Sequence, residues 1–269
     1  MLLTAYGISI LGMIVLPIVM VIYLKRKFDL PWKLPIAGAV TFILSQVLHI
    51  PFLSALTAAF KNGSLPNPPI AWSLPFNAVL LGLLAGIFEE TARYILFKFV
   101  LKQAKTWRDG VLVGAGHGGI EASLLGLLGI ATVVNMVVMK NATDLSAFNI
   151  PADQIELAKQ QIAAFWSTPV YMAFLGLIER AFAICLHLSL SVMVLYSLAY
   201  KKPIWFWIAL LWHAIVDGLA VYLMPSLGAI GIEIVVGVLA VISLVILFKM
   251  RPLFIQEEPT PQTLQSSSL

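Results

Sequence analysis

The stretch VLLGLLAGIFEETARYILFKFVL, residues 79–101, places Glu89, Glu90 and Arg93 inside an apolar run that is long enough to cross a lipid bilayer. A charged side chain near the middle of a membrane costs on the order of 3 kcal/mol or more, so a helix bundle keeps it only where it pairs or lines a cavity. These side chains therefore predict a buried polar centre in a membrane protein.

The composition of the 269-residue chain is that of an integral membrane protein. Hydrophobic residues make up 60% and charged residues 11%, and the mean hydropathy is +0.95, values outside the range of soluble domains. Apolar stretches near or above ~18 residues occur at 3–24, 34–60, 78–101, 110–139, 169–200, 203–224 and 227–248. Pro51 and the glycines within 114–119 are places where a helix can kink or break, which leaves six or eight spans as alternatives. We predict an all-α polytopic membrane helix bundle of about seven transmembrane helices.

The cations are divided unequally between the two ends of the predicted spans. Twelve lysines and arginines fall on one side, whereas the other side holds only Lys61, Lys140 and Lys159. Arg93 and Arg180 lie within spans. The positive-inside rule then predicts an outside N-terminus and a cytoplasmic C-terminus. Topology and anionic lipid also explain the pI near 9.2, so we expect a bilayer and no nucleic acid as partner.

Residues 1–255 form the predicted transmembrane domain, and its core motifs lie within 78–220. Between two spans, apolar residues recur at helical spacing in 153–166, which predicts a helix on the outer interface. Residues 256–269 contain too little apolar surface to fold and are expected to form a disordered cytoplasmic tail. Cys185 is the only cysteine, and its apolar span predicts an inert buried thiol.

Other predicted spans also carry polar residues. His117 and Glu121 lie four residues apart in GAGHGGIE, residues 114–121, and His213 and Asp217 repeat this spacing in WHAIVD, residues 212–217. Each pair shares one helix face, and the glycines allow another backbone to approach. The fifth span adds Glu179, Arg180 and His187. Counted along each helix, these groups fall in one slab between the midplane and the cytoplasmic side, which predicts a single shared site.

Each polar residue also has a structural interpretation. Glu90 and Arg93 can form an ion pair that braces two helices. His49 has no acidic partner four residues away and is interpreted as an interhelical hydrogen-bonding residue. The two histidines that do have a carboxylate at i+4 favour a functional role, with Asp217 orienting His213.

Carboxylates and imidazoles around a wetted pocket are the groups that hydrolysis requires. Glu89 or Glu90 can take a proton from water as it attacks an amide, and histidine N–H groups can stabilise the oxyanion. The same groups can instead hold Zn²⁺, for which the candidate ligands are Glu89, His117, His187 and His213. The chain contains no HExxH motif, and a metal-free glutamic mechanism and a zinc mechanism stay equally open.

A proton- or ion-coupled transporter is the main alternative function, because it also needs Glu, Arg and His in a wetted cavity at the midplane. Transport folds often contain repeated halves and paired broken helices, and neither is clear in this sequence. A membrane scaffold, in which the polar residues serve only helix association, is the third possibility.

In their order, these motifs resemble the YhfC family of intramembrane proteases. The resemblance rests on EETAR at 89–93, GHGGIE at 116–121, Glu179-Arg180 with His187, and His213-xxx-Asp217. It covers roughly residues 78–220. The family belongs to a wider group that contains the type II CAAX prenyl proteases, the bacteriocin-processing and self-immunity (CPBP) proteins and the PrsW-like proteases.

The resemblance implies an intramembrane endopeptidase in a multi-pass, bacterial plasma membrane protein. Its substrate would be a membrane protein or a membrane-bound peptide. From the depth of the polar groups, our hypothesis is that the site opens toward the cytoplasmic half of the bilayer. Of the two glutamates in EETAR, one would activate the water, and Arg93 would hold the site together. His117 would assist the water, and His213 with Asp217 would stabilise the oxyanion.

The chain departs from the CAAX-type pattern, which has EExxxR and a Phe-xxx-His motif. The EExxR spacing and Glu121 are closer to the PrsW-like pattern. A prenylated substrate is therefore not implied, and either His117 or Glu121 can be the residue of the second motif.

Overall fold

The computed structural model describes residues 1–142, 144–148 and 150–256, and these fold into helices without a strand. The α-helices are α1 (Leu2–Phe28), α2 (Lys33–Lys61), α3 (Ile70–Ile95), α4 (Trp107–Asn141), α5 (Ile155–Ser167), α6 (Leu175–Ala199) and α7 (Ile204–Gln256). Shorter segments are the π-helical η1 (Leu96–Val100) and the 3₁₀ segments η2 (Leu145–Phe148), η3 (Ala152–Gln154) and η4 (Val170–Phe174). The predicted all-α bundle is confirmed. Of the predicted tail, 257–269 lies outside the described residues.

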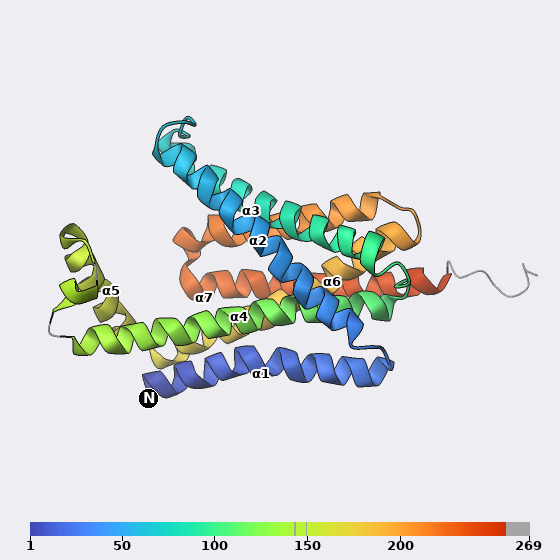
Figure 1. The fold of residues 1–269 in the computed structure, drawn as a ribbon, viewed down its shortest axis with the longest axis horizontal. Coiled ribbons are helices and arrows are strands. Elements are labelled where there is room, and N and C mark those ends of the chain that lie inside the picture. The colour runs from blue at the N-terminus through green and yellow to red at the C-terminus, as the bar shows by residue number, and fades with distance from the viewer. Residues whose placement is uncertain (143, 149, 257–269) are drawn as a thin grey trace, which may run out of the picture.

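Helix α7 is a hairpin of two antiparallel halves (Figure 1). Gly228, with φ 65° and ψ −179°, interrupts it in a conformation that glycine adopts without strain. Trp212 Nε1 donates a hydrogen bond to Ser243 Oγ at 2.9 Å, although the two residues are 31 positions apart. In a straight helix that separation would be about 46 Å. Within the described residues, six helices are long and apolar enough to cross a membrane, and because α7 is a hairpin they make seven crossings, as predicted.

The helices do not break at either of the two places where the sequence allowed a break. Pro51 lies within α2, and the glycines of 114–119 lie within α4, in unbroken helix.

Helix α4 begins with a capping box, in which Thr106 Oγ1 accepts from the Asp109 N–H and the Asp109 carboxylate accepts from the Thr106 N–H. The predicted helix at 153–166 is confirmed as α5, which lies at one end of the bundle (Figure 1).

The chain alternates between the two ends of the bundle as the cation distribution predicts. The connections 29–32, 101–106 and 200–203 lie at the right in Figure 1, and we call this the cation-rich end. The connection 62–69, the segment between α4 and α6, and the turn at Gly228 lie at the left, which we call the cation-poor end. Which end faces the cytoplasm stays a prediction of the positive-inside rule.

Glycines of α4 allow its two neighbours to approach closely. A Cβ atom at Gly116 would collide with the Pro35 carbonyl oxygen of α2, and one at Gly114 would lie 2.6 Å from the His187 carbonyl oxygen of α6. Helix α4 therefore sits in backbone contact with both helices, which brings His117 of α4 next to His187 of α6. The sequence-based expectation for these glycines is confirmed.

Substituting Gly116 with alanine tests this packing. Alanine improves helix propensity by about 1 kcal/mol, but forcing α2 from α4 costs about 1–3 kcal/mol, so we expect Gly116→Ala to lower the unfolding temperature in detergent. The matched control is Gly7→Ala in α1, where a Cβ meets nothing within 4 Å. Equal stability of the two variants would contradict the close α2–α4 contact.

Candidate active site

Seven of the eight predicted site residues meet in the middle of the bundle. They come from α3, α4, α6 and the first half of α7, and they are Glu89, Glu90, Arg93, His117, Glu121, His187 and His213. Most are buried, and Arg93, Glu90 and His117 are completely so. The eighth residue, Asp217, lies at the edge of this cluster with 40% of its side chain exposed.

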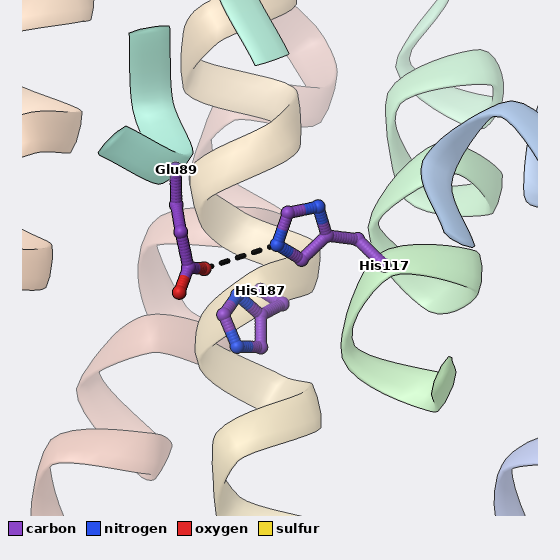
Figure 2. A group of neighbouring side chains, drawn as sticks. All are labelled: Glu89, His117 and His187. Carbon is purple, nitrogen blue, oxygen red and sulfur yellow. Dashed lines mark hydrogen bonds and ion pairs between the residues drawn. The ribbon is translucent and has the colours of Figure 1, made fainter. Parts of the chain in front are cut away.

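Glu89 joins α3 to α4 and to α2. Its Oε2 lies 3.0 Å from His117 Nε2, as Figure 2 shows, and 3.6 Å from Arg93 Nη2. Its Oε1 accepts a hydrogen bond from Gln46 Nε2 at 3.0 Å. Sequence analysis missed Gln46, whose only signal is a polar amide within an apolar span. The carboxylate of Glu89 is thus held at both oxygens.

Glu90 is the counter-ion of Arg93. Its Oε1 accepts from Arg93 Nη1 and lies 2.7 Å from His213 Nδ1. His213 Nε2 is 3.5 Å from Asp217 Oδ2, which is too long for a strong hydrogen bond. His213 was expected to be oriented by Asp217, but the shorter contact is with Glu90. A contact between residues 123 positions apart has no local sequence signal.

His187 lies between two charged groups. Because a guanidinium is only a donor, His187 Nδ1 accepts from Arg93 Nη2 at 2.6 Å. In the neutral imidazole Nε2 then carries the proton and donates it to Glu121 Oε2. Glu121 also accepts from Arg180 at 2.5 Å, and Arg180 donates to Glu179 at 2.5 Å. Glu121 is therefore a partner of His187 and Arg180 rather than of His117, its neighbour at i−4.

A polar cavity of about 90 Å³ adjoins the cluster, between α6 and the two halves of α7. Three groups of the cluster's centre, Glu89, His187 and His213, line this cavity, and Glu90 and Arg93 do not. Of the adjacent glutamates, Glu89 is thus the one in reach of small molecules in the cavity. The volume accommodates several water molecules.

Glu89, His117 and His187 fit a metal ion. Of the described residues, these three each offer a ligand atom within 4.8 Å of the other two, and all three are buried (Figure 2). One carboxylate and two imidazoles with a fourth position open is a donor set of catalytic zinc. His213, a candidate ligand by sequence, is outside this group. To bind an ion, His187 must give up its hydrogen bond to Arg93 or to Glu121.

Fold and site together define a polytopic membrane protein with a buried glutamate, histidine and arginine centre that can take a metal. The model of the YhfC intramembrane metalloprotease family matches residues 12–240. The chain is also 32% identical over 248 residues to "Uncharacterized membrane protein YhfC" of Bacillus subtilis (strain 168), covering 89% of this chain and 92% of that protein. No solved structure matches the chain. This multi-pass membrane protein belongs to the YhfC intramembrane metalloprotease family, as the resemblance predicted.

Neutralising Glu90 tests the buried ion pair. Glu90→Gln keeps the shape of the side chain but leaves Arg93 without its closest counter-ion, and we expect a loss of about 3–5 kcal/mol in unfolding free energy. The control is Glu156→Gln, which removes the exposed pair with Lys159 and costs about 1 kcal/mol at most. Unfolding in detergent measures both, and a loss at Glu90 as small as the control's would refute the assignment.

Proposed function

We propose that the protein is a metal-dependent intramembrane endopeptidase that hydrolyses a peptide bond of a membrane protein or membrane-bound peptide. The observation that carries the proposal is the meeting of Glu89, His117 and His187 inside an apolar bundle, next to a polar cavity. These residues would hold the ion. A bound Zn²⁺ would activate water and polarise the scissile carbonyl.

Glu89 is the carboxylate to which we assign proton transfer. It lines the cavity, whereas Glu90 is enclosed with Arg93 and His213. Oε1 of Glu89 is fixed by Gln46, which aims the carboxylate. We propose that Glu89 takes a proton from the attacking water and returns it to the amide nitrogen when the peptide bond breaks. Since a carboxylate has two oxygens, holding an ion and accepting a proton are compatible roles.

His213 is suited to stabilise the oxyanion. Its Nδ1 is held by Glu90, and the residue lines the cavity. Because Nδ1 donates its proton to the Glu90 carboxylate, Nε2 can donate to a developing negative charge only in the doubly protonated imidazolium form, which the flanking carboxylates of Glu90 and Asp217 favour. Arg93 is a positioning residue in this scheme, because it holds Glu90 and His187 and does not reach the cavity.

The transporter alternative requires access from both sides of the membrane. On the side of the cluster toward the cation-rich end, Leu112, Val113, Leu190 and Val194 are fully buried. The described cavity extends only in the other direction. A polar site with one approach meets the needs of a hydrolase, and it would have to rearrange extensively to move a solute.

Metal analysis of the purified protein tests the ligand set. We expect about one zinc per chain in the wild type after dialysis, loss of zinc in His117→Ala and His187→Ala, and retention in His213→Ala, because two imidazoles and a carboxylate suffice for such a site. His49→Ala is the matched control, as it replaces the one histidine outside the cluster. Loss of zinc in His213→Ala with retention in His187→Ala would contradict the proposed set.

Proteolysis is tested without a chosen substrate by comparing protein N termini in membranes of cells that produce the wild type or Glu89→Gln. We expect new N termini within transmembrane segments in the wild type, reduced on the order of 100-fold in the variant, because proton transfer typically contributes that much or more. Glu156→Gln should behave as the wild type.

The rival function makes the opposite prediction. If cells that produce the wild type showed no such termini, while the purified protein carried protons or a solute into liposomes and Glu89→Gln abolished that flux, the protein would be a transporter and the proposed hydrolysis would be wrong.

A further inference from the structure

The cavity beside the site extends from the site toward the cation-poor end of the bundle. Along α6 its lining runs from His187 back to Glu179, and along the first half of α7 it runs from His213 on to Ala220. Helix α6 begins at the cation-poor end, and the first half of α7 ends there at Gly228 (Figure 1). Both rows of residues therefore lead from the site about 10–12 Å toward the cation-poor end.

The far part of the cavity carries partly exposed charges. The side chains of Glu179 and Asp217 are 45% and 40% exposed, although both belong to membrane-spanning helices. Arg180, between Glu179 and Glu121, is also partly accessible. Lipid tails cannot solvate such groups, so charged side chains in a span line a water-filled space or pair with one another. The polar lining thus marks a wet path.

The opposite side of the site is packed with apolar side chains. Leu190, Met193 and Val194 of α6 are fully buried there, against Leu112 and Val113 of α4, which are fully buried as well. Interiors packed in this way leave no space for water. Between α4 and α6, the path to the site from the cation-rich end is therefore closed. A pocket between α2 and α3 in that half of the bundle is lined mainly by apolar side chains and by none of the site residues, so it offers no polar route for water.

We propose that water and the scissile segment of the substrate reach the site only from the cation-poor end, which the positive-inside rule places outside the cytoplasm. The proposal differs from the sequence-based expectation that the site opens toward the cytoplasmic half of the bilayer. The substrate part rests on the proposed function. It specifies membrane proteins whose cleaved bond lies in the outer half of the bilayer, in a segment that is not helical there, because the backbone of a helix is internally hydrogen-bonded.

Thiol labelling from each side of the membrane tests the direction of access and needs no proteolytic activity. Cys185→Ala yields a cysteine-free chain, since Cys185 is its only cysteine. Into that background we place Ala183→Cys or Ala220→Cys, two small residues that line the cavity. A charged, membrane-impermeant methanethiosulfonate is then added to intact cells or to inverted vesicles, and the mass shift of the protein is measured.

Four further cysteines serve as controls. Ser64→Cys and Gln103→Cys, both at exposed positions, report the cation-poor and cation-rich ends, and so calibrate the side of each preparation. Val194→Cys lies in the apolar packing, and Ile215→Cys lies on an exposed apolar face of the same helix as Ala220. All variants are also labelled after denaturation, which shows that each thiol is present.

We expect both cavity cysteines to label from the same side as Ser64→Cys, and at least ~10-fold faster than Val194→Cys and Ile215→Cys, because thiols in apolar surroundings are inert. Labelling from the side of Gln103→Cys, labelling from both sides, or no labelling of either cavity cysteine would overturn the proposal. Loss of the proposed protease activity with this labelling pattern intact would instead refute the function and leave the access path standing.

Discussion

The guanidinium of Arg93 is the group on which the polar interior depends. It is completely buried among apolar helices, and it contacts Glu90 and His187 directly, with Glu89 Oε2 at 3.6 Å. A cation in such surroundings is stable only while its counter-ions and acceptors are in place. Arg93 thereby ties α3 to α6, and through Glu90 and His213 to α7. The same contacts therefore set the geometry of the site and hold these helices together.

The contacts extend outward from Arg93 in two directions. One leads through His187, Glu121 and Arg180 to Glu179, and the other leads through Glu90 and His213 toward Asp217. Both ends are partly exposed carboxylates, whereas Arg93 and Glu90 at the centre are completely buried. A gradient from solvated rim to enclosed centre lets the protein keep several charges within a membrane, because each is satisfied by a neighbour or by water.

Much of this fold could be predicted from sequence because its signals are local. Hydropathy and length locate the crossings, including the two halves of α7, and spacing places His213 and Asp217 on one helix face. Depth along a helix also predicted a common site. Neither signal reports how a helix is rotated toward its neighbours. The Gln46 contact with Glu89, the Glu121 contact with Arg180, and the direction of the cavity arise from that rotation and required the structure.

The hairpin of α7 has a consequence for how the chain is assembled in the membrane. Its two halves are joined at Gly228 without a polar loop, and no charged residue lies between Asp217 and Glu233. Almost nothing hydrophilic has to be carried across the lipid when this pair is inserted. The two halves can therefore enter the bilayer together as a preformed hairpin. His213, in its first half, then meets Glu90 when the hairpin packs against α3.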